Sequence, residues 1–285
     1  MRTTNPALND KVFDRQISES RAGWAAPDAV RGRRDRPPVD DTVSPWTPPP
    51  PPGAPSAGVD AMSLGGVVSA SAVLLVLVVA AGAFGWSATE VSADGAVADI
   101  PGWFFLALLG GLGIAVLTIF KPKLARFTAP LYALVEGLVL GAISHVYEGR
   151  FDGIVLQAVG LTVGVFALLL FLYATRVIKV TENLRMGIVA ATGAVALVYL
   201  VSIVLRLFGV DVPLIHDAGP VGILFSLVVV VIAALNLVLD FDFIERGAEA
   251  GAPKYMEWYA AFGLLVTLVW LYLELLRLLS KLRER

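Results

Sequence analysis

The sequence contains no cysteine and only two histidines, His145 and His216, which lie far apart in the chain. The absence of cysteine excludes disulfides, thiolate metal sites and cysteine nucleophiles. Two isolated histidines do not form the closely spaced ligand set of a histidine-rich metal site. We therefore expect neither a bound cofactor nor a resident metal.

Charged residues are also scarce. They make up 16% of the chain, whereas hydrophobic residues make up 57% and the mean hydropathy is +0.75. A soluble protein has about 25% charged and about 45–50% apolar residues. The bases are too few and too dispersed for a nucleic-acid-binding surface. The composition predicts an integral membrane protein whose surroundings are a lipid bilayer.

Residues 1–60 differ from the rest of the chain. Arginines are frequent up to Arg36, and residues 37–57 hold the proline runs, including PWTPPPPPGAP. Such runs favour extended polyproline II and cannot pack a core. We expect residues 1–60 to be a disordered cytoplasmic arm and residues 61–285 to be the membrane domain. An alternative is that the arm docks into the aromatic groove of a protein partner. No apolar run precedes the arm, so we expect no cleavable signal peptide.

The remaining chain divides into apolar runs joined by short loops. A helix needs about 20 apolar residues to cross a hydrocarbon core of about 30 Å. The pattern predicts an all-α, polytopic transmembrane helical bundle of about seven spans. These lie at residues 62–85, 102–120, 129–147, 153–174, 186–208, 219–240 and 256–280.

Loop charges indicate the orientation. The loops at residues 121–128 and 175–185 carry bases, whereas residues 86–101 carry three acids and no base. Cytoplasmic loops are the basic ones, so we expect the arm and the N-terminus on the cytoplasmic side of the plasma membrane. The C-terminal bases break the pattern, because seven spans would put them outside. Either the last segment is re-entrant or the earlier spans dominate the topology, and we favour the second. These bases are Arg277, Lys281, Arg283 and Arg285.

Glycines recur within two of the spans. Gly110, Gly111 and Gly113 cluster in the second, and Gly137 and Gly141 form a GxxxG motif in the third. Small residues let helix backbones approach closely. We expect close packing, with a hinge or a pore lining as the functional alternative.

Four carboxylates lie in or at the end of apolar spans. Glu136 lies mid-span in the third, Asp240 and Asp242 lie at the end of the sixth, and Glu274 lies in the seventh. Ionisable groups inside a membrane are costly and mark functional sites by default. The structural alternative for Glu136 is an internal hydrogen bond to a serine or a backbone carbonyl.

The other three carboxylates have structural alternatives too. Asp240 and Asp242 would lie at a helix end that reaches headgroups or water. Glu274 would form a salt bridge with Arg277, three residues later on the same helix face. Asn236, one turn before Asp240, is a candidate for hydrogen bonding between helices.

No enzyme motif accompanies these carboxylates. The sequence has no HExxH and no Walker-type GxxxxGK, and Ser144-His145 lacks a GxSxG context or a third triad member. An intramembrane aspartyl protease is disfavoured because no aspartate has a GxGD context. We expect a protein that is not an enzyme.

Three stretches of the sequence resemble a known family. They are PLYALVEGLVLGAISHVYEG, then QAVGLTVGVFALLLFLYATRVIKVT, and the pairing of LNLVLDFDFI with LYLELLRLLSKL. Their order and spacing, with the span count, resemble the Bax inhibitor-1 / YccA family of seven-span proteins in its bacterial branch. The resemblance covers about residues 62–283, and the first 60 residues lie outside it.

The resemblance implies a pH-sensitive calcium leak across the membrane and, in eukaryotic members, suppression of stress-induced cell death. Two acidic residues on the last two spans act as the pH sensor in bacterial members. Asp240 matches the first and Glu274 the second, where aspartate is usual. Some members carry a carboxylate on the second span and a base near its end. Here the second span has no carboxylate, and we expect Glu136 to replace it; Lys121 stands at the span's end.

A gating mechanism follows from the resemblance. Two carboxyls held together in a low dielectric share a proton, because both cannot ionise cheaply. The shared proton would tie the last two spans together, and its loss would let one carboxylate pair with Lys121. We expect transient Ca²⁺ contacts at Asp240 and Glu274, because Ca²⁺ accepts irregular oxygen ligands. The alternatives are a proton-coupled secondary transporter and a non-conducting scaffold that regulates a stress-response partner through the arm.

Overall fold

The computed structural model describes residues 61–90, 102–209 and 219–284, and the expectations for the arm lie outside these residues. Seven long helices cover most of the described chain, with a short 3₁₀ helix, η1 (Pro122–Leu124), before α4. Each of the seven long helices is long and apolar enough to cross a membrane, so the predicted all-α, seven-span fold is confirmed. The helices are α2 (Leu64–Ser87), α3 (Gly102–Phe120), α4 (Ala125–Arg150), α5 (Ile154–Ala174), α6 (Glu182–Leu207), α8 (Pro220–Glu249) and α9 (Met256–Arg283).

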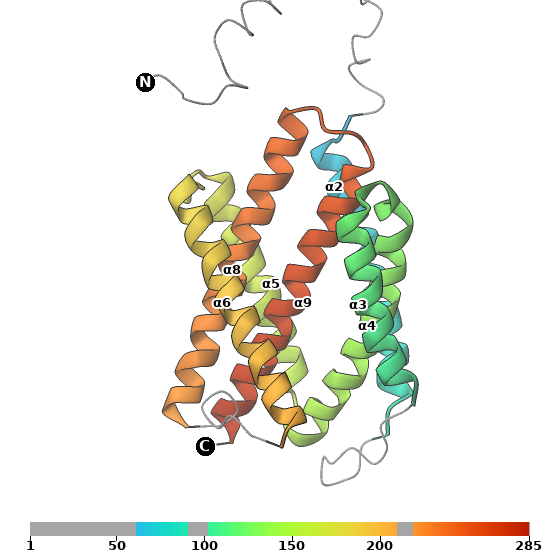
Figure 1. Ribbon diagram of the computed structural model, residues 1–285, viewed down its shortest axis with the longest axis vertical. Helices are drawn as coiled ribbons and strands as arrows, with labels where there is room; N and C mark the ends of the chain where they lie inside the picture. The colour runs from blue at the N-terminus through green and yellow to red at the C-terminus, as the bar shows by residue number, and fades with distance from the viewer. Residues whose placement is uncertain (1–60, 91–101, 210–218, 285) are drawn as a thin grey trace, which may run out of the picture. The chain divides into compact units, whose positions relative to one another are not determined.

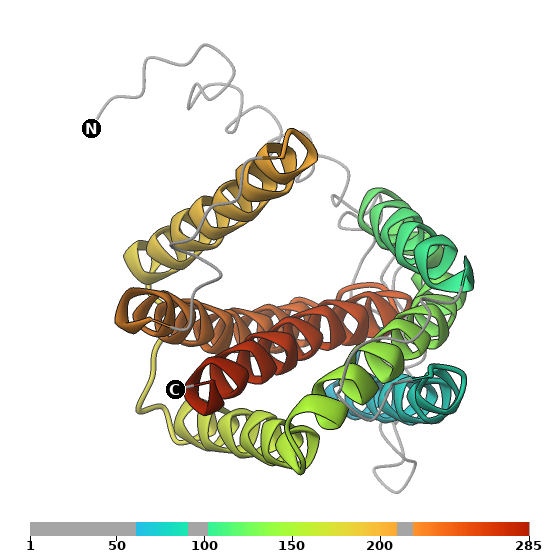
Figure 2. The same ribbon diagram turned by 90° about the horizontal axis from the view of Figure 1, so that it is seen from below.

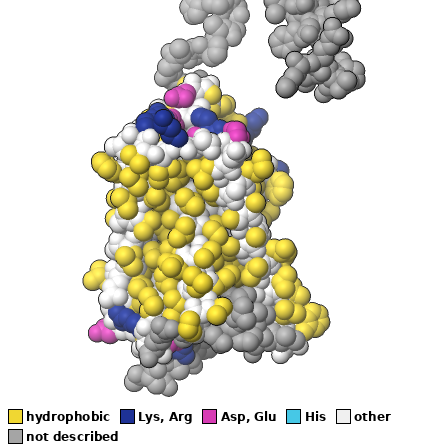
Figure 3. Space-filling model, turned by 90° about the vertical axis from the view of Figure 1, so that its left-hand side faces the viewer, with side chains coloured by type: hydrophobic (Ala, Val, Ile, Leu, Met, Phe, Trp, Pro, Cys, Tyr) yellow, Lys and Arg dark blue, Asp and Glu magenta, His cyan; other side chains and the backbone are white. Residues whose placement is uncertain are grey.

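The outer surface of the helices is apolar. Large side chains such as Val79, Leu106, Leu156 and Ile203 are more than half exposed. Figure 3 shows hydrophobic side chains across the middle of one face, with lysine, arginine and acidic side chains near its two ends. A soluble protein rarely exposes so large an apolar surface, whereas a bilayer covers it. The protein is therefore a multi-pass membrane protein.

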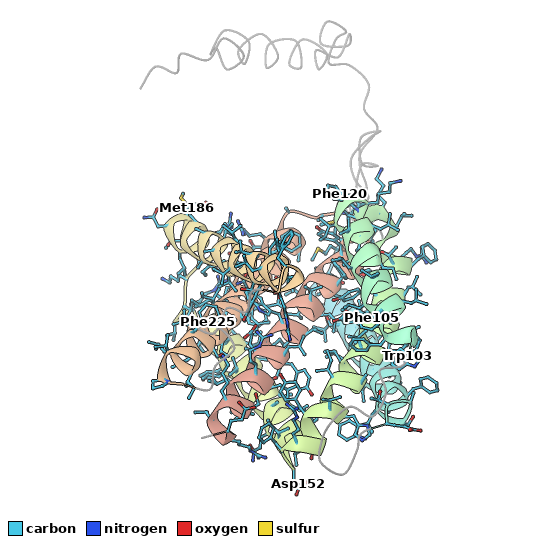
Figure 4. All side chains as sticks on the ribbon, turned by 60° about the horizontal axis from the view of Figure 1, so that its bottom comes forward. Trp103, Phe105, Phe120, Asp152, Met186 and Phe225 are labelled. Atoms are coloured by element: carbon cyan, nitrogen blue, oxygen red, sulfur yellow. The ribbon has the colours of Figure 1, made fainter. Side chains whose placement is uncertain are left out.

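Successive helices run in opposite directions, so they begin alternately at the two ends of the bundle. Figure 4 shows Phe120 and Met186 at one end of the helices and Asp152 at the other. Phe120 ends α3 and Met186 lies in the first turns of α6, whereas Asp152 follows α4. We call the end with Phe120 and Met186 the N-side, because α2 also begins there, and the end with Asp152 the C-side.

Helix α8 is longer than the apolar pattern predicts. The sequence suggested an end near residue 240, but the helix continues to Glu249. Asp242 and Arg246 form an ion pair at i,i+4, which supports the polar extension. The helix stops at Gly251, whose φ of +63° suits a left-handed C-terminal cap. Asp240 consequently lies inside the helix rather than at its end.

Helix α9 is the central helix. It packs against α2, α4, α5 and α8, and Figure 2 shows it running through the middle of the helices. One side of α9 contributes Phe262 and Leu265 to a core with α2 and α4. Another side contributes Leu271 and Leu276 to a core with α5 and α8. A helix that is apolar nearly all round is expected to be buried.

The last segment is not re-entrant. Helix α9 is continuous over 28 residues and ends near the C-terminus on the C-side, as Figure 1 shows. Two of the bases that break the loop-charge pattern belong to the bundle itself. Arg277 pairs with Glu274, and Lys281 is buried against α8. They are therefore not loop charges, which removes part of the conflict with the positive-inside rule.

The GxxxG motif is a packing motif between α2 and α4. A Cβ at Gly141 would lie 1.9 Å from the Gly82 carbonyl oxygen, and one at Gly137 would lie 2.6 Å from the Val78 carbonyl oxygen. Only glycine allows this approach, as expected. Gly110 differs, because a Cβ there would meet nothing within 4 Å.

The start of α2 is tied to the start of α9. Ser63 caps α2 through its hydroxyl, and its N–H and O–H both donate to Glu257 Oε1 at 3.0 Å. The Met62 N–H donates to the Ala252 carbonyl at 2.7 Å. The chain therefore enters the membrane domain beside the loop between α8 and α9.

Candidate functional site

Asp240 lies on α8 where that helix faces α9. Its neighbours Leu237, Val238 and Phe241 are buried. The carboxyl group hydrogen-bonds with the Thr267 side chain of α9. Its Oδ2 atom is buried and has no hydrogen-bond partner. Thr267 already donates to the Gly263 carbonyl at 3.2 Å, so it only partly satisfies the carboxyl group.

Glu274 is the most deeply buried carboxylate among the described residues, with 2% of the residue exposed. Its Oε1 accepts hydrogen bonds from the Tyr199 hydroxyl and from Arg277 Nη1, both at 2.8 Å. Its Oε2 has no partner. The ion pair with Arg277 confirms the structural alternative that the i,i+3 spacing suggested.

Arg277 also contacts Tyr199 directly. Its Nη1 donates to the Tyr199 hydroxyl at 2.6 Å, and its guanidinium carbon lies 5.0 Å from the centre of the tyrosine ring. Tyr199 comes from α6, so a triad of Tyr199, Glu274 and Arg277 joins α6 to α9.

The contacts between α8 and α9 define an antiparallel register. Asp240 meets Thr267, and Ser226 accepts a hydrogen bond from Lys281 Nζ at 2.9 Å. The separation is the same on both helices, since 240 − 226 and 281 − 267 both equal 14. Glu274 lies midway between Thr267 and Lys281, on the same face of α9.

The structure does not bring Asp240 and Glu274 into contact. Glu274 lies seven residues beyond Thr267, which is about 10 Å along a helix at about 1.5 Å per residue. No hydrogen bond joins the two carboxyl groups, and each has its own polar neighbours. In the described conformation Asp240 and Glu274 therefore both lie in the interface between α8 and α9, but they share no proton. We call this interface the carboxyl seam.

Glu136 lies between α4 and α3. Its carboxylate bonds with the Tyr132 side chain one turn earlier, and its Oε2 lies 3.4 Å from the position that a Cβ of Gly111 would occupy. The partner is thus a tyrosine rather than the expected serine or backbone carbonyl. The carboxylate comes from α4 and lies against Gly111 in the glycine stretch of α3; that it replaces the carboxylate of other members stays a prediction.

A family model described as Bax inhibitor 1 like matches residues 5–284 of the chain. The chain belongs to this family. No curated protein matches the sequence. The match begins at residue 5 and is therefore longer than the resemblance over about residues 62–283 that the motifs indicate.

Asp242 and Lys121 lie at the N-side and do not join the buried carboxyls. Asp242 forms ion pairs with Arg185 of α6 and Arg246 of α8. Lys121 is exposed at the end of α3, and none of the ion pairs among the described residues involves it. In this conformation Asp242 anchors α6, and Lys121 does not approach a carboxylate.

Polar side chains hold α6 against the bundle. Besides the pair of Arg185 with Asp242, Asn236 Nδ2 donates to the Thr192 hydroxyl at 2.8 Å, as its predicted role between helices requires. Tyr199 supplies the third contact. Most apolar side chains of α6 are exposed. Polar contacts between helices therefore contribute much of the packing of α6 against the bundle.

Thr267, Tyr199 and Lys281 were not identified from the sequence. Tyr199 has a recognisable signal, because it is the only aromatic residue in α6. Lys281 was grouped with the bases of the C-terminal tail, and Thr267 is an uncharged residue that the sequence pattern does not distinguish. Only the register of α8 and α9 assigns the two to the carboxyl seam.

The seam does not resemble a resident metal site. Among the described residues no group of three or more histidines, cysteines, aspartates and glutamates is arranged to hold a metal. A bound Ca²⁺ takes about six to eight oxygen ligands. Asp240 with Thr267 offers fewer oxygens than this.

Proposed function

We propose that the protein is a pH-sensitive cation leak pathway of the plasma membrane, with calcium as the permeant ion. The observation that supports this proposal is that two carboxyl oxygens in the carboxyl seam are buried without a hydrogen-bond partner. They are Asp240 Oδ2 and Glu274 Oε2. Buried polar atoms without partners are rare, and each calls for an explanation. A transient cation would supply the missing partner.

In the proposed pathway an ion meets Asp240 first from the N-side. The Asp240 carboxylate and the Thr267 hydroxyl offer hard oxygens, which suit Ca²⁺. Protonation of Asp240 would remove the charge that attracts the ion. Flux should therefore rise with pH, and a single buried carboxyl suffices for this response without a shared proton.

Glu274 forms the second step of the proposed pathway. In the described conformation the Arg277 guanidinium occupies the cation-binding side of Oε1. An ion that passes must compete with this tethered cation, so the ion pair would act as a barrier toward the C-side. With such a barrier, the pathway would leak slowly rather than conduct like an open pore.

The proposed orientation has the N-terminus in the cytoplasm. The loops at the N-side carry Lys121, Lys123, Arg176 and Lys179, which fits the positive-inside rule. The arm, including its proline runs, would then be available to a cytoplasmic protein partner.

Calcium flux into liposomes that contain the purified full-length protein tests the proposal. Flux that increases between about pH 6 and pH 8 supports a carboxyl-controlled leak. Protein-free liposomes and liposomes loaded with a sodium or potassium gradient provide the control and the ion comparison. Absence of protein-dependent cation flux at any pH would overturn the proposal.

The same liposomes separate the two alternatives. A proton-coupled transporter would show flux that saturates and requires a counter-gradient of protons. A scaffold would show no flux, and its activity in cells would depend on residues 1–60. A leak requires neither a proton gradient nor the arm.

A further inference from the structure

A cavity of about 300 Å³ lies at the C-side between α4 and α9. Three bases line it: Arg150, the last residue of α4, and Arg277 and Lys281 of α9. The lining includes one acid, Glu284. Asp240 does not line the cavity, which borders the carboxyl seam through Arg277 and Lys281.

The two arginines have donors available to a ligand. Within the described part of the chain, the Arg277 guanidinium makes its hydrogen bonds through Nη1, which contacts Glu274 and Tyr199. Arg150 is exposed, and none of the ion pairs among the described residues involves it. A guanidinium presents its donors as a planar fork that matches two oxygens of a phosphate. Two such forks from two helices at one cavity favour an anion with several oxygens.

The cavity also has an apolar side and a position that suit a lipid. Val146 and Phe151 line it beside the bases. Arg150 is the last residue of its span, and Asp152, two residues on, lies at the C-side end of the bundle (Figure 4). The ends of spans lie at the level of the lipid headgroups, where arginines meet phosphates.

We infer that this cavity binds the phosphate group of an anionic membrane lipid, with Arg150 and Arg277 as the ligands of the phosphate oxygens. Val146 and Phe151 contact the glycerol and the first acyl carbons. This inference does not depend on cation flux. A free phosphate ion shares the charge chemistry but gains nothing from the apolar side of the cavity.

The test is a lipid titration of the full-length protein in a neutral detergent. The probes are dihexanoyl phosphatidylglycerol, dihexanoyl phosphatidylcholine and inorganic phosphate, and the readout is the thermal unfolding midpoint as each probe is added. We expect the anionic lipid to raise the midpoint in a saturable way. The zwitterionic lipid should have little effect.

Two variants locate the site. Arg150→Gln removes one ligand at an exposed position and should leave the midpoint without lipid unchanged. It should weaken the apparent affinity for the anionic lipid about tenfold, as expected for one charged hydrogen-bonding group. Arg206→Gln is the matched control, because Arg206 is exposed in the last turn of α6 at the same end and does not line the cavity.

Each alternative outcome contradicts a defined part of the inference. Equal lipid affinity in Arg150→Gln and the wild type would overturn the site. If Arg206→Gln lost as much lipid affinity as Arg150→Gln, the effect would come from general surface charge, and the proposed site would also be overturned. Inorganic phosphate that binds as tightly as the lipid, with the same dependence on Arg150, would overturn the lipid assignment in favour of a free phosphate.

Discussion

Arg277 donates a hydrogen bond of 2.8 Å to Glu274 one turn before it on α9, and both side chains also contact the Tyr199 hydroxyl of α6. Glu274 is 2% exposed, and among the described residues Arg277 is the base that forms an ion pair with it. The ion pair therefore connects three features of the molecule: the carboxyl seam, the attachment of α6 and the cavity at the C-side.

Removing the arginine should destabilise the bundle. Arg277→Gln leaves the Glu274 carboxylate buried without a counter-charge, which costs about 3 kcal/mol when a buried pair is broken on one side. Adding Glu274→Gln should recover part of this loss, because the double variant has no uncompensated charge. Unfolding in detergent measures both, with Arg206→Gln as the control. A double variant that is less stable than Arg277→Gln would contradict this account of the pair.

The contact between α2 and α4 makes a second prediction. Gly141→Ala forces a Cβ to within 1.9 Å of the Gly82 carbonyl oxygen, so the helices must separate. Overpacking of this kind costs about 1–3 kcal/mol. Gly110→Ala is the matched control, because nothing lies within 4 Å and alanine favours a helix over glycine by up to about 1 kcal/mol. Equal unfolding midpoints for the two variants would argue against the close α2–α4 contact.

Cysteine labelling tests the orientation without background, because the chain has no cysteine. Lys123→Cys and Asp152→Cys introduce thiols at exposed positions on the N-side and the C-side. In intact cells we expect an impermeant thiol reagent to label position 152 and not position 123. Ala125, in the same loop by sequence, is fully buried and would be a poor labelling site. Labelling of position 123 alone would reverse the orientation.

The arm should be dispensable for the stability of the bundle. Residues 1–60 hold too few apolar side chains to offset the entropy lost on ordering them. Deletion of residues 1–60 should leave the unfolding midpoint in detergent nearly unchanged. Deletion of residues 1–62 should lower it, because the Met62 N–H and its buried side chain contact the loop before α9. A large fall on deleting residues 1–60 would show that the arm packs on the bundle.

The spans were predictable from the sequence because hydropathy alone determines which segments can enter a bilayer. The end of α8 was not, since its extension depends on charges that pair on the helix surface, such as Asp242 with Arg246. The sequence also identified Asp240 and Glu274 as unusual groups in apolar surroundings. It could not predict that they lie two turns apart in one seam, because that depends on the register between α8 and α9.

The register itself depends on contacts with weak sequence signals. Ser226 and Thr267 are ordinary residues of apolar helices, and only their partners Lys281 and Asp240 give them a role. Lys281 was misinterpreted because a base near a chain end usually faces water. Here its Nζ also donates to the Gly222 carbonyl of α8 at 3.0 Å, so the charge lies inside the bundle.

The buried carboxyls should set the pH response of the flux. Asp240→Asn keeps the shape of the side chain and removes the titrating group, so flux should no longer change with pH. Glu249→Gln is the matched control, because Glu249 is an exposed carboxylate on the same helix. Glu274→Gln should also alter the profile, because it releases Arg277 from its counter-charge.

The decisive measurement is calcium flux into liposomes that contain the wild type, Asp240→Asn or Glu249→Gln, across about pH 6 to pH 8. The account predicts flux that rises with pH for the wild type and for Glu249→Gln, and a flat profile for Asp240→Asn. An Asp240→Asn profile that rises as steeply as the wild type would contradict the proposed role of Asp240.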